Sequence, residues 1–306
     1  MPRVAVITPT YNRGHNGLLE KTMLSVLGQS FHDFLYVIVD DGSTDNTSDV
    51  VGRYAGRDRR VVYHRKERGT DQRLGASAAR NFGIECLDDY DVEFVTFLDS
   101  DDLYTRDCIE KKLTACTPGI RMVYSWLGAF RGMSPVRVMK GENTNNPLEM
   151  AAIMKSRQSS CFPYLTMFLS ASLLNEVGKF DENLAYGEDR DFSVRTLERL
   201  REGEMAVVPE ILHYYRLHDD GVCGFYNGSQ EASSDIKYFF DKHGRTRGVA
   251  TVEMAKQFLM RPHTFLPEVI KRRLRPLRDE VTSRFSDFEL EPFAQQIESR
   301  EGNLGL

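Results

Sequence analysis

Short runs of apolar residues recur along the first 130 residues, and polar, helix-like segments separate them. The runs are almost wholly apolar rather than alternating, which is typical of strands that are covered on both faces. They predict five strands, at Val4 to Thr8, Leu35 to Asp40, Val61 to His64, Phe94 to Leu98 and Met122 to Trp126.

Helical spacing appears between these runs. One predicted helix has apolar residues that recur at helical spacing, at Leu18, Leu19, Met23, Val26 and Leu27. A second helix, over residues 45–55, follows a Ser-Thr-Asp capping cluster, and residues 75–87 form a third candidate. The β-α-β-α-β order predicts an α/β fold in which helices flank a mainly parallel sheet.

The rest of the chain is less regular. Residues 131–160 are polar and rich in Pro and Asn, which predicts a loop or a boundary. Residues 161–218 are mixed, and after about residue 228 the pattern is mostly helical and amphipathic. We therefore expect a helical C-terminal extension over residues 226–306.

Composition narrows the class of protein. The 306 residues are 41% hydrophobic, enough for a large core, and the net charge of -5 gives no basic field for nucleic acid. No apolar run approaches the roughly 20 residues that cross a bilayer, and the N-terminus lacks the features of a secretory signal. We expect a soluble, cytoplasmic chain whose five cysteines, none in a CxxC pair, are reduced.

Two acidic turns directly follow predicted strands, at residues 40–41 and 99–102. The carboxyl ends of parallel strands share one edge of a sheet, so the turns meet there and repel each other unless something cationic lies between them. Carboxylates two positions apart, as in Asp99 and Asp101, can share a divalent cation such as Mg²⁺ or Mn²⁺. Taken alone, the second turn is equally typical of a solvated acidic turn or a helix N-cap.

Five short motifs occur in a fixed order along the chain. They are Pro-Thr-Tyr-Asn at 9–12, Asp-Asp-Gly-Ser-Thr-Asp at 40–45, Ala-Arg-Asn-Phe-Gly at 79–83, Gly-Glu-Asp-Arg-Asp at 187–191 and Tyr-Arg-Leu-His at 215–218. In this combination the sequence resembles family 2 of the inverting glycosyltransferases, over roughly residues 3–220. The resemblance implies the GT-A fold of the nucleotide-diphospho-sugar transferases, with a Rossmann-like, mixed but mainly parallel sheet. It also implies one domain over residues 1–225, with a nucleotide-binding half (1–130) and an acceptor half (131–225).

The resemblance implies where the nucleotide binds. Tyr11 would stack on or line the base, with the backbone of Pro9 nearby, and Asp40 would accept a hydrogen bond from a ring N–H of the base, most often uracil. Asp99, with Ser100 beside it, would face the ribose or the sugar. From the residues alone, packing against the next helix would also explain Tyr11, and helix capping would explain Asp40.

The same resemblance implies a metal site for Mn²⁺ or Mg²⁺. Asp101 would be its firmest ligand, with Asp99 as a second ligand and Asp102 as a neighbour. His218 matches a position where family members supply a late ligand to the metal or the diphosphate, although a lone histidine can equally be structural. A cation there would neutralise the charge that develops on the leaving nucleoside diphosphate.

Asp189 matches the catalytic base of the family. A carboxylate placed to take the proton of an acceptor hydroxyl supplies about 10² to 10⁴ in rate. The alternative is that the acidic residues of 188–191 only cap a helix and complement its dipole. Arg73 and Arg80 are candidate contacts to the diphosphate, although Arg80 could instead bridge carboxylates at the sheet edge.

The expected activity is transfer of a sugar, as by a hexosyltransferase, from a nucleotide sugar to a saccharide, lipid-linked or other hydroxyl acceptor, as in polysaccharide biosynthesis. UDP-sugar is the expected donor. A sugar-phosphate nucleotidyltransferase and a non-catalytic binding protein are the alternatives, whereas a dinucleotide oxidoreductase lacks its GxGxxG loop. The basic residues of 271–278 are either a solvated helix face or a peripheral contact with a membrane. The sequence leaves open whether the chain forms a homo-oligomer.

Overall fold

The computed structural model describes residues 3–66, 75–131, 134–139, 145–156, 164–184, 187–217, 238–239 and 241–243. In chain order its elements are β1 (Val4–Thr10), α1 (Leu18–Leu27), β2 (Phe34–Asp40), α2 (Thr47–Ala55), β3 (Val61–Arg65), α3 (Ala76–Glu85), η1 (Cys86–Asp89), β4 (Phe94–Phe97), β5 (Leu103–Tyr104), α4 (Cys108–Ala115), β6 (Met122–Arg131), β7 (Ser134–Met139), α5 (Pro147–Ser156), η2 (Tyr164–Thr166), β8 (Phe168–Ser170), α6 (Ala171–Val177), α7 (Glu188–Arg199) and β9 (Met205–Arg216).

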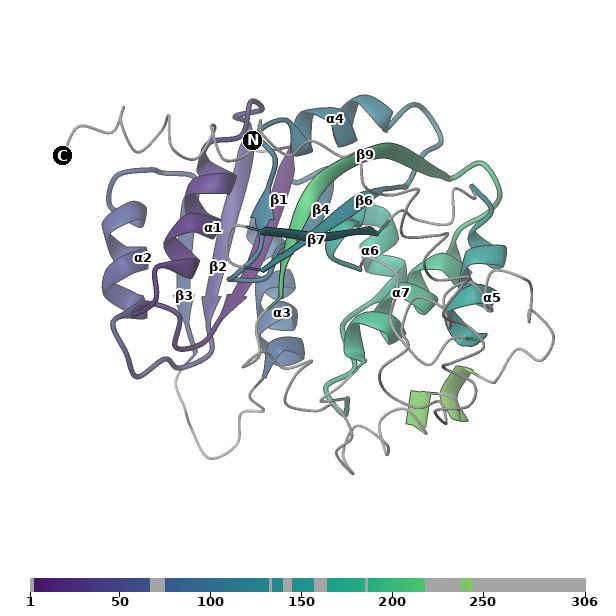
Figure 1. Cartoon of the computed structure of the whole chain (residues 1–306). Coiled ribbons are helices and arrows are strands. Elements are labelled where there is room, and N and C mark those ends of the chain that lie inside the picture. Colours follow the sequence, from purple (N-terminus) through teal and green to yellow (C-terminus); the bar gives the residue numbers. More distant parts are fainter. Residues whose placement is uncertain are drawn as a thin grey trace, which may run out of the picture. The chain divides into compact units, whose positions relative to one another are not determined.

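The described strands form one sheet of nine, in the order β3-β2-β1-β4-β8-β6-β9-β5, with β7 paired to β6 (Figure 1). β3, β2, β1 and β4 are mutually parallel, and β6 is parallel to β9. β8 runs antiparallel to both β4 and β6, so β4, β6 and β9 point the same way. The carboxyl ends of β1, β2, β4 and β9 therefore lie along one edge of the sheet.

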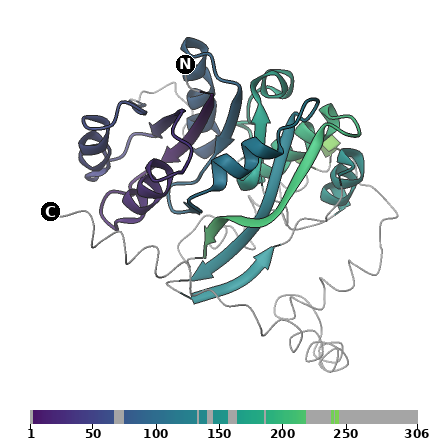
Figure 2. The ribbon, with the colours of Figure 1, turned by 90° about the horizontal axis from the view of Figure 1, so that it is seen from above.

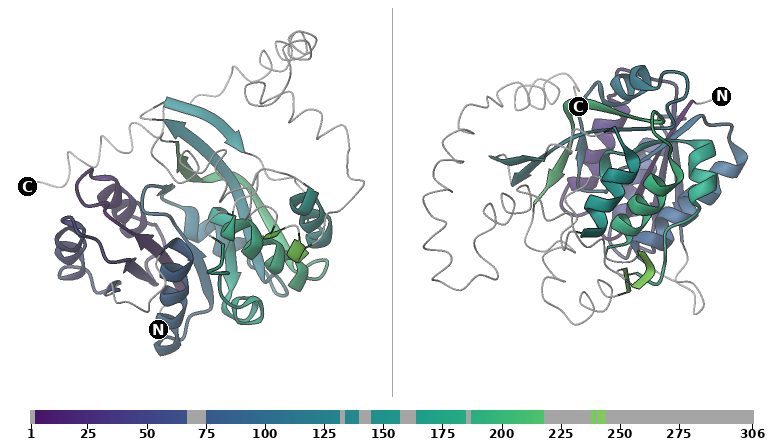
Figure 3. Two further views of the ribbon diagram at one scale, coloured as in Figure 1. Left: turned by 90° about the horizontal axis from the view of Figure 1, so that it is seen from below. Right: turned by 90° about the vertical axis from the view of Figure 1, so that its right-hand side faces the viewer.

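Side chains on the two faces of the sheet build two separate cores, because successive residues of a strand point to opposite sides. On one face, Ala5 and Ile7 of β1 pack with residues of α3, α5, α6 and α7. On the other face, Val4 and Val6 pack with residues of α1, α2 and α4. Figures 2 and 3 show the strands lying between these helices. Coverage of both faces explains why the strands read as continuous apolar runs.

Helix α3 approaches the sheet closely at Gly83. A Cβ at this position would lie 2.6 Å from Cγ2 of Ile7 and 3.3 Å from Cγ2 of Val39. Only a residue without a side chain fits at these distances. This contact places the preceding turn of α3, which carries Arg80, close to the strand ends.

The structure confirms the five predicted strands and the three predicted helices, with ends that differ by a few residues. The expectation of a loop or a boundary over residues 131–160 is wrong for residues 134–139 and 147–156, which form β7 and α5. β7 pairs only with β6 among the described strands. The polar residues that suggested a loop, Gly-Glu-Asn-Thr-Asn-Asn at 141–146, lie in the chain between β7 and α5.

The chain divides into two compact units, Met1–Arg245 and Thr246–Leu306. The second unit lies outside the described residues, as does most of the expected helical extension over residues 226–306. The division of residues 1–225 into two halves stays a prediction. In the described residues, no helix is both long enough and apolar enough to cross a membrane.

Candidate active site

The acidic turn after β4 is anchored from inside the protein by Asp102. This residue is fully buried, and its carboxylate accepts a hydrogen bond from the backbone N–H of Arg216 at 2.9 Å. Its second oxygen lies 3.1 Å from Nε2 of His213, which is also fully buried. The turn is closed by a hydrogen bond from the N–H of Asp102 to the carbonyl of Asp99. Asp102 thus ties the turn to β9.

Burial shifts the pKa values of Asp102 and His213 in opposite directions. Burial, together with the nearby charges of Asp101 and Asp99, raises the pKa of Asp102 well above its usual range. Burial lowers the pKa of His213 well below its usual range, so the imidazole is neutral near pH 7. Asp102 and His213 hold the turn in place from its buried side, and neither side chain faces solvent.

Asp99 and Asp101 are the exposed members of the turn, with side-chain exposures of 30% and 14%. Each one faces an arginine. Asp99 accepts a hydrogen bond from Arg80 at 2.7 Å, and Asp101 lies 3.2 Å from a guanidinium nitrogen of Arg13. Ser100 between them is buried. The repulsion expected between carboxylates at this edge is therefore offset by two cationic side chains.

The carboxylates of this turn provide part of a binding site for a divalent cation. Asp99 and Asp101 supply hard oxygen ligands of the kind that Mg²⁺ and Mn²⁺ prefer, and both are partly open to solvent. Within the described ranges, no group of three or more His, Cys, Asp or Glu side chains is arranged to hold a metal ion. Mg²⁺ commonly takes its remaining ligands from substrate phosphates and water, so two carboxylates are sufficient protein ligands. The predicted ligand His218 lies outside the described residues.

The turn after β2 carries Asp40, whose carboxylate is fully buried. One oxygen accepts a hydrogen bond from the N–H of Ser43 at 2.7 Å, and the other accepts from the hydroxyl of Tyr63 at 2.7 Å. The neighbouring Asp41 accepts from the N–H of Gly75 at 2.7 Å and lies 3.7 Å from Nζ of Lys66. Both carboxylates therefore organise this turn, and the predicted contact between Asp40 and a base stays a prediction.

The loop after β1 lies against the loop after β2. The N–H of Asn12 donates to Oγ of Ser43 at 2.9 Å, and the Asn12 side chain accepts from the N–H of Thr44 at 2.8 Å. Asn12 adopts a positive φ of 50°, which asparagine tolerates better than most residues. Tyr11 is 44% exposed beside this junction, whereas Pro9 is buried within β1. An exposed aromatic ring is the group that a planar base needs.

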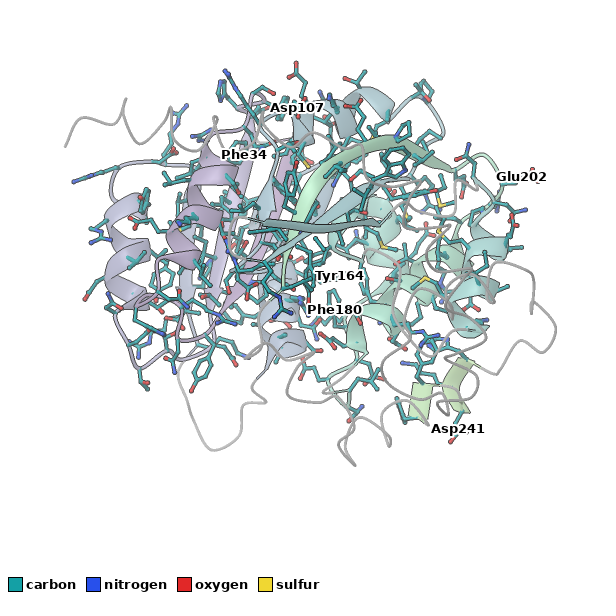
Figure 4. The ribbon with its side chains drawn as sticks, in the orientation of Figure 1. Phe34, Asp107, Tyr164, Phe180, Glu202 and Asp241 are labelled. Carbon is teal, nitrogen blue, oxygen red and sulfur yellow. The ribbon has the colours of Figure 1, made fainter. Side chains whose placement is uncertain are left out.

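Arg80 crosses from the acidic turn to the start of α7. Its guanidinium donates to Asp99 at 2.7 Å and to Glu188 at 3.0 Å, and its side chain is only 4% exposed. The guanidinium carbon also lies 4.9 Å from the ring centre of Tyr164 and 5.5 Å from that of Phe180. Figure 4 shows these two rings beside each other in the middle of the molecule. Arg80 thus bridges carboxylates, the alternative left open by the sequence. The other candidate, Arg73, lies outside the described residues.

Asp189 lies in the first turn of α7, after Gly187, which adopts a positive φ of 83°. Burial raises the pKa of Asp189, although a hydrogen bond from the N–H of Arg190 at 2.7 Å opposes this rise. Burial and the charge of Asp189 together raise the pKa of Glu188 to about 7, although Arg80 opposes this rise. A carboxylate whose pKa is raised toward neutrality is suited to accept a proton in a reaction near pH 7.

Several residues of the site were not identified from the sequence. Arg13 directly follows the Pro-Thr-Tyr-Asn motif, and Glu188 lies within the Gly-Glu-Asp-Arg-Asp motif, where the sequence suggested only a role in capping the helix. Tyr164 and His213 carry no such signal, because their partners Arg80 and Asp102 are far away along the chain.

Known proteins match the chain in sequence and in structure. The family model described as glycosyl transferase family 2 matches residues 5–170, more than half of the 306 residues. The GalNAc(5)-diNAcBac-PP-undecaprenol beta-1,3-glucosyltransferase of Campylobacter jejuni is 39% identical over 124 residues, which cover 40% of this chain and 38% of the relative. The chain spans about two fifths of the length of the first curated relatives that it matches.

Two solved structures share the fold. S. aureus TarS in complex with UDP-GlcNAc matches with a TM-score of 0.59 and 20% identity, over 97% of this chain and 78% of that one. The mannosyltransferase PcManGT from Pyrobaculum calidifontis, in complex with GDP-Man and Mn²⁺, matches with a TM-score of 0.55 and 16% identity, over 98% of this chain and 80% of that one. These likenesses confirm the predicted GT-A fold.

Proposed function

Because this chain belongs to glycosyl transferase family 2, we propose that it transfers a sugar from a nucleotide-diphosphate sugar to an acceptor hydroxyl, with inversion at the anomeric carbon. One observation carries the proposal. Arg80 joins Asp99, at the end of β4, to Glu188, directly before Asp189. Arg80 thereby links the residues proposed to bind the donor to the turn that carries the proposed base.

On the donor side, we propose that Tyr11 stacks on the base and that the turn of Asp40 and Asp41 recognises its polar edge. The exposure of Tyr11 supports the first role. UDP-sugar is the proposed donor, and TarS and PcManGT, with UDP-GlcNAc and GDP-Man, share the fold.

Asp99 and Asp101 would hold Mn²⁺ or Mg²⁺, with His218 as a further proposed ligand. When bound, the cation would neutralise the diphosphate as it leaves. Pro9, Ser100 and Arg73 remain proposed donor contacts.

On the acceptor side, we propose that Asp189 takes the proton of the attacking hydroxyl. Its raised pKa and its place in the first turn of α7 support this role. Direct attack on the anomeric carbon without a covalent intermediate leads to inversion. The name of the C. jejuni relative includes a polyprenol-linked acceptor, so a saccharide or lipid-linked acceptor is proposed here. A cytoplasmic place, with peripheral contact at the membrane, is part of the same proposal.

A panel of UDP-, GDP- and dTDP-sugars tests the proposal. The full chain is incubated with each donor, with Mn²⁺ or with EDTA, and the release of nucleotide and the thermal stabilisation by each donor are measured. We expect one nucleotide to stabilise the protein and to be released only with the metal. Turnover that is equal in EDTA would remove the role given to Asp101, and the absence of binding by every donor would overturn the function.

A further inference from the structure

Asp191 is a fully buried carboxylate that three basic side chains surround. Arg195, one turn along α7, donates to one oxygen at 2.8 Å. Lys242 and His243 both reach the other oxygen, each at 2.8 Å. Although burial acts to raise it, the hydrogen bonds from His243 and Lys242 lower the pKa of Asp191 to about 2. Asp191 is therefore charged at neutral pH and depends on these partners.

The short segment of Tyr238, Phe239 and residues 241–243 has further contacts at the same place. Lys242 also pairs with Asp181 at 2.7 Å, and the hydroxyl of Tyr238 donates to Asp181 at 3.0 Å. Phe239 is only 3% exposed and belongs to the core that includes α7. Figure 1 shows the segment below α7, and Figure 4 labels Asp241 within it.

Arg190 forms a second link between the segment and the turn of α7 that carries Asp189. Its guanidinium carbon lies 4.7 Å from the ring centre of Phe239, and its Nε donates to the carbonyl of Met154 at 2.9 Å. The backbone N–H of the same residue donates to Asp189. Asp189 therefore lies between Glu188, which Arg80 holds, and two residues that the segment contacts.

The position of Asp191 along the helix connects the segment to the chemistry. Its N–H donates to the carbonyl of Gly187 at 3.0 Å, which closes the first turn of α7 around Asp189. Removing one partner from a buried ion pair leaves a charge without compensation, and the structure around it shifts. Loss of the charge of Lys242 would therefore first disturb the turn that carries Asp189.

We propose that Lys242 and His243 are positioning residues that fix the first turn of α7, and with it Asp189, for proton transfer. The inference rests on the proposed function, in which Asp189 is the base. It assigns a role in catalysis to a segment that lies beyond residues 5–170, the part that matches the family. The segment acts through Asp191 and Arg190.

Lys242→Met in the full chain tests the proposal, because methionine keeps the length of the side chain without its charge. We expect kcat for transfer to fall at least tenfold, whereas the KM for the donor and the Kd for the nucleotide stay within twofold. Lys242→Arg should restore most of kcat. Lys155→Met is the matched control, because Lys155 pairs with Glu198 near the other end of α7, and its kcat should be unchanged.

Hydrogen exchange provides a readout that does not depend on turnover. We expect the amides of residues 188–192 to exchange faster in Lys242→Met, whereas those of the acidic turn at 99–102 do not change. Equal kcat and equal exchange in wild type and variant would overturn the proposal. Loss of nucleotide binding in step with kcat, without rescue by Lys242→Arg, would also overturn it, because the role is then only structural. If the wild type transfers no sugar, the proposed function fails, and the exchange of residues 188–192 alone decides whether the segment fixes α7.

Discussion

Asp101, predicted to be the firmest metal ligand, lies 3.2 Å from the guanidinium of Arg13. Arg13 follows the Pro-Thr-Tyr-Asn motif, so the loop after β1 brings a positive charge to the carboxylate that would hold the cation. A cation bound by Asp101 must compete with this charge. The proximity has a measurable consequence for metal binding.

Removing the charge of Arg13 should strengthen metal binding in the absence of nucleotide. Two charges about 4 Å apart near a protein surface interact by up to about 4 kcal/mol, and solvent screening reduces this at a partly exposed site. We expect Arg13→Gln to bind Mn²⁺ about three- to tenfold more tightly, as measured by titration calorimetry. Arg53→Gln, which removes an exposed partner of Glu20, is the control and should bind Mn²⁺ like the wild type. Weaker or equal Mn²⁺ binding by Arg13→Gln would show that the arginine does not compete with the metal.

Tyr63 should matter for stability rather than for catalysis. Its hydroxyl donates to the buried carboxylate of Asp40, and an unsatisfied buried acceptor costs about 1–3 kcal/mol. We expect Tyr63→Phe to lower the free energy of unfolding in urea by that amount.

Variants of Asp40 and Asp41 then distinguish a structural role of this turn from a role in binding the nucleotide. Asp40→Asn should show a loss of stability comparable to that of Tyr63→Phe. If Asp40→Asn instead keeps its stability and loses only nucleotide affinity, Asp40 contacts the base as the sequence predicted. Asp41→Asn is measured alongside, because Asp41 lies between Lys66 and Gly75.

Turnover should depend on pH through the coupled carboxylates Glu188 and Asp189. Burial raises the pKa of both, that of Glu188 to about 7, and a base must be deprotonated to act. Activity should therefore be low in acid and rise with pH as Asp189 loses its proton. Glu188→Gln removes a neighbouring negative charge, so the pKa of Asp189 falls and the rise moves to lower pH. The pH profile of kcat checks this, and a profile that Glu188→Gln leaves in place would argue against coupling.

Local pattern was enough to predict the strands and helices of the first half, because their apolar residues are buried on regular faces. The pattern failed at residues 134–139 and 147–156, because the polar residues between them at 141–146 made the whole stretch resemble a loop. The ordered motifs indicated the acidic turns and Asp189. They could not indicate His213 or Lys242, because those residues act through pairs with Asp102 and Asp191 that only the folded chain brings together.

The contacts of Arg80 are a second example of an arrangement that the sequence alone could not predict. The sequence suggested both a phosphate contact and a link between carboxylates, and only the fold places Asp99 and Glu188 on either side of the guanidinium. Asp99 belongs to a predicted acidic turn and Glu188 to a predicted motif, but their separation in space does not follow from their spacing along the chain.

The role of Asp189 is tested most directly by comparing transfer and nucleotide binding in Asp189→Asn. The amide keeps the shape of the side chain but cannot accept the proton of the acceptor, so we expect kcat to fall by about 10² to 10⁴. The Kd for the nucleotide, measured by calorimetry with Mn²⁺ present, should stay within about twofold, because binding does not require the proton transfer. Transfer at the wild-type rate, or an equal loss of transfer and of nucleotide binding, would contradict the account.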